Sequence, residues 1–361
     1  MKKYLALMLA LAMTLGLTAC GSGGSGNSGS TDGAASNGGG SASSSAGAET
    51  AADGPKMTLK LGVSTNDTDP RTLAAQEFKA EVEEKTGGSI TVEIYTSGQL
   101  GGDAQLIEAL ALDSGTVDII ITDASNFATY EPTMGVSALP FQFKDFEMAW
   151  AFMDSEIEAA AEEKLISQNM RVLSHYDNGF RCVTTGSKEV NTPADMNAML
   201  IRTPENPVIM ATMQAMGANP QPLAFSELYQ ALNQGTYDAQ ENPVPVIYNN
   251  NLFEVQAYLS VTNHIYSGMC FTVSESSWQK MNDAQREVVD AAAKSSAEVN
   301  RAMNKQQTEE LLSKLEEEGM TVIQPDLAPF QEATASVAES YRSTYGTMLD
   351  DLSAWLSSYA G

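Results

Sequence analysis

Positively charged residues are scarce in this chain. Its 361 residues include 20 Lys and Arg but 46 Asp and Glu, which gives a formal net charge of −26 at pH 7. A surface of this charge repels a polyanion, so nucleic acid is not expected as the main partner. Hydrophobic residues still make up 43% of the chain, as in ordinary globular proteins. The composition therefore excludes collagen, a wholly disordered chain and a small disulfide-dense scaffold.

Histidine and several catalytic motifs are also missing or rare. The two histidines, His175 and His264, leave little material for a His-rich metal centre. The part of the chain expected to fold contains no G-x-S-x-G, H-E-x-x-H, G-x-x-x-x-G-K-[ST] or paired C-x-x-C. We therefore expect no metal and no cofactor, and an enzyme is disfavoured. A glycosidase-type carboxylate pair stays open, because 46 acids allow many spatial pairs and none stands out.

Residues 1–20 have the pattern of a lipoprotein signal peptide. A positively charged start, M-K-K, precedes an apolar run over 4–17 that is too short for a stable membrane span. The segment ends in L-T-A-C, followed by Gly, which resembles the bacterial lipobox. This resemblance implies that Cys20 carries lipid and anchors the protein to the outer face of the cytoplasmic membrane. The alternative is a plain secretory signal with an incidental cysteine.

Residues 21–55 are predicted to be a flexible tether. Gly, Ser and Ala occupy 27 of these 35 positions, too small and polar a composition to form a core. A random coil of this length spans about 30–35 Å. The folded part is then expected over 56–361, which is long enough for two lobes with separate cores.

Strands and helices are expected to alternate along this folded part. The expected strands are 59–63, 90–95, 117–121, 171–175, 180–185 and 199–202. The expected helices are 72–85, 103–113, 145–168, 208–216, 228–232 (with Ser226 as its N-cap) and 283–318, the last crossing the outside and bridging both lobes. Because hairpin turn signals are absent, the pattern favours α/β layers around a parallel sheet.

One segment of the sequence is repeated in outline. Residues 108–118 read E-A-L-A-L-D-S-G-T-V-D, and residues 227–238 read E-L-Y-Q-A-L-N-Q-G-T-Y-D. Both end in Gly-Thr-x-Asp after an Ala-Leu pair. The repeat has two explanations: a chance recurrence of helix, glycine stop and strand, or two lobes of related plan that enclose a ligand cleft.

Two cysteines remain in the expected folded part. Cys182 and Cys270 both lie in short strand-like runs. Outside the cytoplasm they could form a disulfide, but two ordinary buried thiols fit equally well.

Arg181 and Arg202 are informative because cations are so few. Each lies at or near the end of an expected strand. A guanidinium is permanently charged and matches a carboxylate in a two-pronged fashion. Each arginine therefore either pairs with a structural Asp or Glu, or faces a cleft and binds an anionic ligand.

Seven short tags together resemble one protein family. They are Q-L-G-G-D at 99–103, G-T-V-D at 115–118, L-P-F at 139–141, I-R-T-P at 201–204, M-G-A-N-P at 216–220, A-F-S-E-L-Y at 224–229 and Q-E-N-P at 240–243. In order and spacing they resemble the DctP-type solute-binding proteins of TRAP transporters, over about residues 57–350. Two departures are Ala239, where the family usually has Gly, and Asp69-Pro70, where many relatives carry His.

The resemblance implies a fold and a set of ligand-binding residues. The fold is a two-lobed α/β clamp, like that of periplasmic binding proteins, with long connecting helices. Arg202 would form the salt bridge to the ligand carboxylate, and Arg181, Phe225 and Asn242 would line the pocket. Without the resemblance, Phe225 would be a core aromatic and Asn242, which precedes Pro243, a turn residue.

The first lobe is expected to bind the other end of the ligand. Ser64, Asp103, Asp123 and Ser125 are the candidates for its hydroxyl groups. An acid at Asp103 or Asp123 would repel a dianion, so a sugar acid such as a hexuronate is preferred and a C4-dicarboxylate comes second.

The resemblance also implies partners. A lipid-anchored receptor would deliver a small organic acid to the small and large TRAP membrane subunits. The alternatives are a lipoprotein that captures a ligand for a sensor, and a secreted hydrolase that uses an unrecognised carboxylate pair.

Overall fold

The computed structural model describes residues 50–359, and residues 48–361 form one compact unit. The expected signal peptide, with Cys20, and most of the expected tether lie outside the described residues. No helix among residues 50–359 is both long and apolar enough to cross a membrane.

The first lobe is built on three parallel strands. β1 (Met57–Gly62) pairs with β2 (Ile90–Tyr95) on one side and with β3 (Ile119–Asp123) on the other. α1 (Pro70–Lys85) connects β1 to β2, and α2 (Asp103–Ala111) connects β2 to β3. The Ile-Ile-Ile run of β3 is fully buried, as expected of a strand covered on both faces. The expected strand at 117–121 is thus confirmed with a shift of two residues.

The second lobe repeats this plan. β5 (Leu200–Thr203), α5 (Pro207–Ala215), β6 (Asn219–Pro222), α6 (Phe225–Asn233) and β7 (Ala239–Pro243) follow in the same order, and β5 pairs in parallel with β6 and β7. β6 was not expected, because its sequence N-P-Q-P reads as a turn. It is the edge strand of the sheet, where proline is tolerated.

The repeated segments occupy equivalent places in the two lobes. Asp118 Oδ2 accepts a hydrogen bond from Lys60 N in β1 at 2.9 Å, and Asp238 Oδ2 accepts one from Leu200 N in β5 at 2.9 Å. The backbone N–H of Asp118 also donates to the Lys60 carbonyl at 2.8 Å, and that of Asp238 donates to the Leu200 carbonyl at 2.9 Å. The preceding glycines adopt left-handed φ angles of 70° at Gly115 and 67° at Gly235. The matching contacts support the interpretation that the lobes share one plan.

Two long strands join the lobes and make the sheet mixed. β4 (Met170–Thr185) and β8 (Tyr258–Ser274) are antiparallel to each other, and the strand order is β2-β1-β3-β8-β4-β7-β5-β6, with β9 (Thr321–Ile323) on β8. The expectation of a purely parallel sheet is therefore wrong. The two strands expected at 171–175 and 180–185 are one strand, and register shifts at 177–179 and 181–183 bend it without ending it.

The helix expected over 145–168 is broken at Asp154 and Ser155. α3 (Phe146–Met153) ends there and α4 (Glu156–Leu165) begins, followed by the 3-10 turn η4 (Ile166–Gln168). Ser155 has extended backbone angles, and the Asp154 carboxylate is held by Arg301 at 2.6 and 2.8 Å. The ion pair between Asp154 and the distant Arg301 thus stabilises a helix break that the local sequence does not predict.

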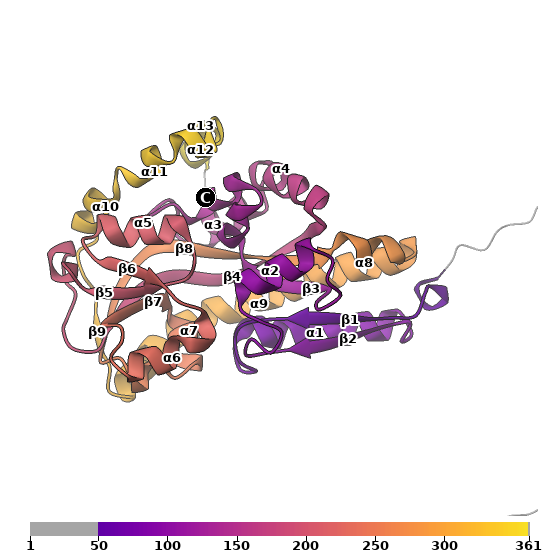
Figure 1. Ribbon diagram of the computed structural model, residues 1–361, viewed down its shortest axis with the longest axis horizontal. Helices are drawn as coiled ribbons and strands as arrows, with labels where there is room; N and C mark the ends of the chain where they lie inside the picture. Colours follow the sequence, from indigo (N-terminus) through magenta and orange to yellow (C-terminus); the bar gives the residue numbers. More distant parts are fainter. Residues whose placement is uncertain (1–49, 360–361) are drawn as a thin grey trace, which may run out of the picture. The chain divides into compact units, whose positions relative to one another are not determined.

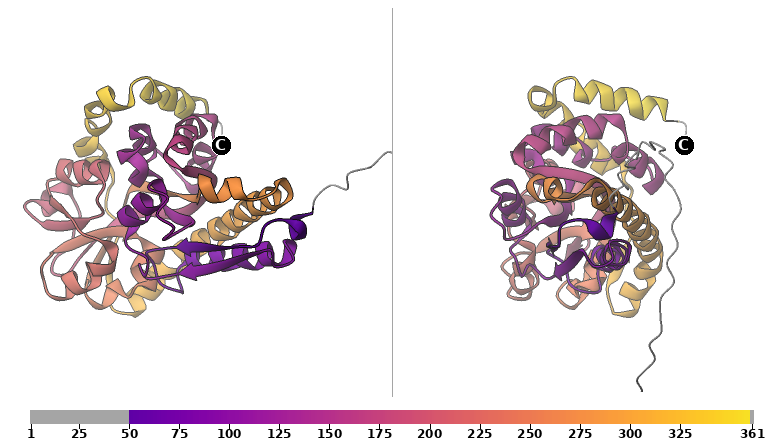
Figure 2. Two further views of the ribbon diagram at one scale, coloured as in Figure 1. Left: turned by 45° about the vertical axis from the view of Figure 1, so that its right-hand side comes forward. Right: turned by 90° about the vertical axis from the view of Figure 1, so that its right-hand side faces the viewer.

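Two helical segments bridge the lobes. α9 (Asp283–Glu317) contacts α1 in the first lobe and α7 (Val244–Asn249) and β9 in the second, as expected from its length (Figure 1). The C-terminal helices α10 (Ala328–Thr334), α11 (Val337–Ser340), α12 (Arg342–Tyr345) and α13 (Met348–Ser358) pass from α5 back to α4. Figure 2 shows this yellow segment above the helices between β3 and β4.

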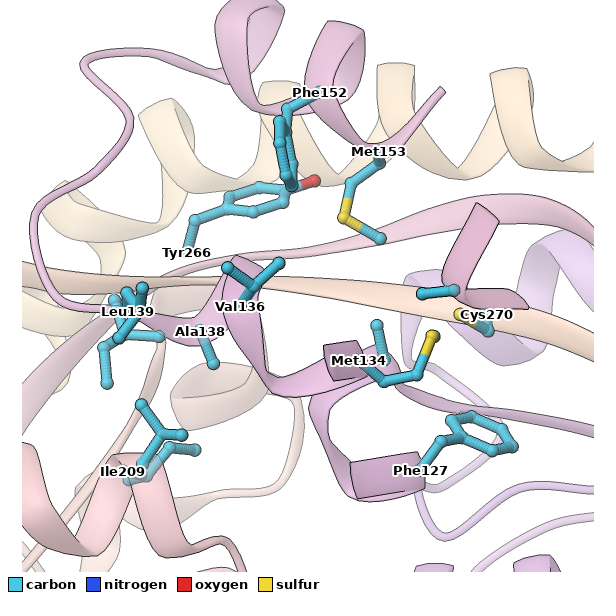
Figure 3. Packing of buried hydrophobic residues seen from close by; sticks show 14 of the residues in the cluster. Phe127, Met134, Val136, Ala138, Leu139, Phe152, Met153, Ile209, Tyr266 and Cys270 are labelled. Carbon is cyan, nitrogen blue, oxygen red and sulfur yellow. The ribbon is translucent and has the colours of Figure 1, made fainter. Parts of the chain in front are cut away.

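Several separate cores support this arrangement. One lies between α1, α9 and the first-lobe strands, and two lie in the second lobe. The largest gathers residues from α2, α3, α4, α5 and two 3-10 segments, η2 (Ala124–Thr129) and η3 (Pro132–Ala138). Figure 3 shows Phe152 beside Tyr266, with Val136 and Leu139 of this cluster nearby.

The expected boundary at residue 56 is a few residues late. Ala51–Asp53 form a 3-10 helix, η1, and Ser89 Oγ donates to the Ala51 carbonyl at 2.7 Å. Gln285 Nε2 of α9 donates to the Pro55 carbonyl at 3.0 Å. Residues 50–55 therefore belong to the folded unit and not to the tether.

Candidate functional site

The cleft lies where the carboxyl ends of the parallel strands in both lobes face one another. An outer cavity of about 420 Å³ adjoins a small inner cavity, and the two share Asp103, Asn126, Arg202, Pro204 and Phe225. The inner cavity is also lined by Ser64, Thr65, Arg71, Asp123, Asn178, Arg181, Asn242 and Val246. Strand ends of this kind are the usual binding place in α/β sheets.

Arg202 is buried without a counter-ion. It is the third residue of β5 and 2% exposed, and its Nε and Nη2 both donate to the Leu223 carbonyl, at 2.9 and 2.5 Å. The guanidinium lies 5.9 Å from the ring centroid of Phe225 and forms no ion pair with a carboxylate of residues 50–359. Burial lowers its pKa to about 10, and nearby Glu241 offsets only part of this effect. The side chain remains a cation that an anion would stabilise.

Arg181 is already paired. Its Nε lies 2.5 Å from Glu241 Oε2 and its Nη2 lies 2.7 Å from Glu241 Oε1, a two-pronged contact in which the carboxylate is 0% exposed. Burial disfavours the charged form of Arg181, but Glu241 outweighs it and raises the pKa. In the same way Arg181 and His264 keep the pKa of Glu241 below its ordinary value despite burial. Arg181 lines the inner cavity, but the Glu241 carboxylate already neutralises most of its charge.

Asn242 and Phe225 complete the second-lobe wall. Asn242 Oδ1 accepts from Arg181 Nη2 at 3.2 Å, and its Nδ2 donates to Gln240 Oε1 at 2.5 Å. Phe225 is the first residue of α6, because the helix starts after Ala224 and not after Ser226 as expected. Its ring both packs on the neighbouring core and lines the cavity, so the two expected roles coexist.

The first-lobe acids differ in how far they are satisfied. Asp123 ends β3, accepts from Ser125 N at 2.9 Å and accepts from the Ser267 hydroxyl. Asp103 opens α2, and its Oδ1 is buried with no hydrogen-bond partner among residues 50–359. Asp103 lines both cavities, and its Oδ1 is a buried acceptor that has no donor among residues 50–359.

Ser64 lines the inner cavity as expected, but Ser125 does not. Ser125 is 2% exposed, donates its hydroxyl to Asp123 and accepts from Asn206 Nδ2 at 2.5 Å. Asn206 caps α5, so this bond connects the two lobes behind the cavity wall. The Ser125 hydroxyl has these two partners in this structure, and its contact with ligand stays a prediction.

A second hydrogen bond joins the two lobes. Asn66, just after β1, donates through Nδ2 to the Asn249 carbonyl of α7 at 2.7 Å. Its Oδ1 accepts from Thr68 N at 3.1 Å, which fixes the orientation of the side chain. The two lobes thus touch through polar groups that a small hinge motion would separate.

Sequence reasoning missed Arg71 and Asn178. Arg71 is 5% exposed and lines the inner cavity; its Nη2 donates to Asn178 Oδ1 at 3.3 Å, while its Nε is buried without a partner. Asp69 Oδ1 accepts from Arg71 N at 3.0 Å and so caps α1 at the carboxyl end of β1. The rule that helices following parallel strands begin at the cleft could have indicated this arginine.

The charges of the inner cavity nearly balance. Three arginines, Arg71, Arg181 and Arg202, face Asp103 and Asp123, with Glu241 behind Arg181. Amide and hydroxyl groups fill the positions between them. The arrangement suits a small polar anion with hydroxyl groups, and no residue in it forms an exposed nucleophile beside a base.

The structure describes Cys182 and Cys270 but not Cys20, the expected lipidation site. Cys182 and Cys270 are both free and buried, so they do not form a disulfide in this structure. Cys20 lies outside the described residues, and its lipidation stays a prediction.

Several characterised proteins are similar to the chain over most of its length. It is 34% identical over 301 residues to the solute-binding protein RD1_1052 of Roseobacter denitrificans, covering 82% of this chain and 91% of that protein. It is 29% identical over 267 residues to the 2,3-diketo-L-gulonate-binding periplasmic protein YiaO of Escherichia coli, covering 74% and 81%.

Solved structures show the same fold. A TRAP periplasmic solute-binding protein from Polaromonas, bound to D-erythronate, matches with a TM-score of 0.81 and 30% identity over 85% of this chain and 100% of that one. The sugar acid binding protein DctPAm of Advenella mimigardefordensis, with galactonate, matches with a TM-score of 0.81 and 28% identity over 84% and 99%. A similar protein from Sulfurospirillum deleyianum, with succinate, matches with a TM-score of 0.79 and 29% identity over 83% and 99%.

The expected fold is therefore confirmed, as is the expectation of a binding protein and not an enzyme. Residues 61–344 match the family described as bacterial extracellular solute-binding protein, family 7. The chain belongs to this family, DctP, the solute-binding proteins of TRAP transporters.

Proposed function

We propose that this protein captures a small sugar acid outside the cytoplasm and delivers it to the membrane subunits of a TRAP transporter. In this proposal Arg202 binds the ligand carboxylate through a charge-assisted contact. The first-lobe groups Asp103 and Ser64 then bind its hydroxyl groups.

The observation that carries the proposal is the difference between the two second-lobe arginines. Arg181 is satisfied by Glu241, whereas Arg202 has only the Leu223 carbonyl and the face of Phe225. A buried guanidinium without an anion is costly, and a ligand carboxylate would remove that cost. Arg202 is therefore the group best prepared for an anionic ligand.

The ligand class follows from the opposite wall. Asp103 Oδ1 is a buried acceptor without a donor, which a hydroxyl satisfies and a second carboxylate does not. Similar proteins were solved with D-erythronate, galactonate, β-D-galacturonate and L-gulonate, all acids that carry several hydroxyl groups. These ligands belong to those proteins, but they agree with the chemistry of this cavity.

Binding is coupled to closure of the lobes. The carboxylate contact is made by the second lobe alone, so it can form while the cleft is open. Contacts to Asp103 and the Asn66–Asn249 bond need both lobes and exist only in the closed form. The ligand therefore selects the closed form through contacts that the open form lacks.

The closed form would present both lobes to the small and large membrane subunits. A lipid on Cys20 would keep the receptor close to them and raise its effective concentration. The same cleft could serve a sensor, and the two outcomes differ in whether uptake of the acid stops when the receptor is removed.

A C4-dicarboxylate is the second candidate, and Arg71 is the observation that favours it. Its guanidinium lines the inner cavity with Nε unpartnered, so it could bind a second carboxylate. One similar protein was solved with succinate. Asp103 opposes this candidate, and Arg71 supports it.

The test is a thermal-shift and calorimetric screen of residues 48–361. This stretch forms one compact unit, and the solved relatives that it matches are covered over 99–100% of their length. The panel contains galactonate, glucuronate, erythronate, succinate and malate. A ligand present at 100 times its Kd stabilises by about 2.7 kcal/mol, which a thermal shift detects.

Asp103→Asn separates the two ligand classes. With a sugar acid as ligand, the variant binds it more weakly and gains affinity for succinate, because the repelling charge is gone. With a dicarboxylate as ligand, wild type already prefers succinate and Arg71→Met abolishes that preference. If no acid shifts the unfolding temperature, the carboxylate clamp is refuted.

A further inference from the structure

A second cluster of chemically active side chains lies between α4 and the β4–β8 pair. His175 of β4 and Cys270 of β8 are directly opposite in the strand ladder. Glu158 and Glu162 are one turn apart on α4, so they share a face of that helix. The donor atoms of Glu162, His175 and Cys270 all lie within 4.8 Å of one another. None of these four residues lines the ligand cleft.

The cluster is buried but reachable from solvent. Cys270 and Glu158 are 0% exposed, while the side chains of His175 and Glu162 keep 10% and 12% exposure. These last two residues line a separate cavity of about 390 Å³ between α4, β4 and α9. An ion could thus enter from this cavity and reach the buried thiol. Cys270 also belongs to the largest apolar core, and Figure 3 labels it among the side chains of that core.

Glu158 is an unsatisfied carboxylate at this place. Both of its oxygens are buried with no hydrogen-bond partner among residues 50–359. Burial and the neighbouring Glu162 raise its pKa well above the ordinary value. Buried carboxyl groups are normally hydrogen-bonded or neutralised by a cation, so this one needs an explanation.

His175 is held in the orientation of a metal ligand. Its Nδ1 lies 3.0 Å from Asp154 Oδ1, and Asp154 is fixed in turn by Arg301. This leaves Nε2 directed at Glu162 Oε1, 2.5 Å away. A carboxylate on one ring nitrogen that leaves the other free to coordinate is the usual arrangement around metal-binding histidines.

We propose that Glu162, His175 and Cys270 bind a divalent transition-metal ion of the zinc class, with the unpartnered carboxyl group of Glu158 beside them. One imidazole, one thiolate and one carboxylate form a mixed N, S, O set that zinc accepts and that magnesium and calcium do not, and a water molecule would take the fourth position. Bonds of about 2.0–2.3 Å in a tetrahedron place ligand atoms roughly 3.3–3.8 Å apart. The 3.9 Å between Glu162 Oε1 and Cys270 Sγ is slightly longer than this spacing, so these two atoms must approach as the ion enters, while the His175–Glu162 pair must open by about 1 Å.

Metal binding here releases protons. The Cys270 thiol must lose its proton to become a thiolate, and the proton shared by His175 and Glu162 leaves as the ion takes its place. Affinity therefore rises with pH. The ion would tie α4 to both of the long strands that run through the two lobes.

The competing explanation is an ion-pair network without metal. Burial disfavours protonated His175, but Glu162 and Asp154 outweigh it and raise its pKa to about 9. The imidazolium could then neutralise the surrounding acids by itself. In that case the cluster is structural and binds no transition metal.

Cobalt(II) distinguishes the two explanations, because a cobalt–thiolate bond gives an intense near-ultraviolet charge-transfer band. Residues 48–361 contain two thiols, Cys182 and Cys270, so Cys182→Ser is the matched control for Cys270→Ser. Reduced protein is stripped with a chelator and titrated with Co²⁺, and zinc is then added to displace the cobalt.

We expect the band at one cobalt per chain in wild type and in Cys182→Ser, and its absence in Cys270→Ser. Asp154→Asn should weaken binding by about 10- to 100-fold and keep the band. Arg202→Ala should leave it unchanged, so the result is independent of ligand capture in the cleft. A missing band in wild type, or a band that survives in Cys270→Ser, overturns the proposal. If Cys270→Ser does not fold, Cys182→Ser decides, because Cys270 is then the one thiol left.

Discussion

Replacing Arg202 by alanine tests the cleft most directly, and Arg181→Ala is its matched control. Both residues are buried arginines that line the same inner cavity. They differ in one respect: Arg181 has a carboxylate partner in Glu241, and Arg202 has none. We therefore expect opposite effects on ligand binding and on folding.

For Arg202→Ala the loss falls on binding. Breaking a desolvated pair between a guanidinium and a carboxylate costs about 2–5 kcal/mol, or roughly 30- to 4,000-fold in Kd. Folding changes little, because two effects oppose each other. The variant loses its bonds to the Leu223 carbonyl, but it also loses the burial penalty behind the pKa of about 10, which corresponds to roughly 3 kcal/mol.

For Arg181→Ala the loss falls on folding. The variant leaves Glu241 charged, 0% exposed and without its main partner. Such an uncompensated buried charge destabilises a protein by about 3–5 kcal/mol.

The assay combines calorimetry with the best sugar acid and urea denaturation without ligand, both on residues 48–361. If Arg202→Ala binds as tightly as wild type, Arg202 does not anchor the carboxylate. If Arg181→Ala unfolds at the wild-type urea concentration, Glu241 is not held by that arginine.

Four further substitutions test closure, acid stability and the repeated plan of the lobes. Asn66→Ala removes a bond that exists only across the closed cleft, so we expect ligand affinity to fall by about 2- to 10-fold in calorimetry; an unchanged Kd would show that this contact does not report on closure. Glu241→Gln tests acid stability: the folded-state pKa of Glu241 lies below 4.5, so its contribution is complete above pH 4.5 and disappears as the pH falls further. Urea melts from pH 7 to pH 3 should therefore show the gap between wild type and this variant narrowing only below pH 4.5, and a gap independent of pH would contradict the pairing. Asp118→Ala and Asp238→Ala each leave one strand N–H unpaired, so urea melts should show a loss of about 1–2 kcal/mol in each variant. The loss should be larger for Asp118→Ala, because Asp118 Oδ1 also accepts from the buried Ser277 hydroxyl, and a loss confined to one variant would argue against equivalent roles.

Local sequence predicted the parallel parts of both lobes well. The strand at 90–95 and the long helix from 283 match β2 and α9 closely, because alternation and helical spacing are strong there. The Gly-Thr-x-Asp repeat also indicated the shared plan, since the glycine needs a left-handed φ and the aspartate binds a neighbouring strand. The alternation, the helical spacing and the glycine turn depend on residues close in sequence.

The features that were missed depend on distant residues. The break between α3 and α4 is set by Asp154, whose partners His175 and Arg301 lie 21 and 147 positions away. β4 reads as two strands because its middle, Y-D-N-G, is rich in turn residues, yet β8 pairs along its full length. Pairing with a distant strand overrides local turn preference.

In the candidate site, too, the features that the sequence did not predict depend on distant residues. Most of the residues expected from the family tags line the inner cavity. The sequence could not decide whether either arginine was free, because the answer depends on Glu241, which lies 60 positions after Arg181. It also gave no sign that Asn206 of the other lobe donates to the Ser125 hydroxyl. Whether a polar side chain already has a hydrogen-bond or ion-pair partner depends on the tertiary structure.

The shared plan of the lobes finally explains how the cleft can discriminate between the two ends of a ligand. α2 and α6 are equivalent helices, and the first residue of each faces the cavity: Asp103 in one lobe and Phe225 in the other. Duplicated lobes would by themselves give a symmetric cleft. Here one lobe supplies an unpartnered acceptor, and the other supplies a guanidinium held between a backbone carbonyl and an aromatic face. Under the proposed function, a ligand with a carboxylate at one end and hydroxyl groups at the other would satisfy both walls in one orientation only, because reversal would place its carboxylate against Asp103.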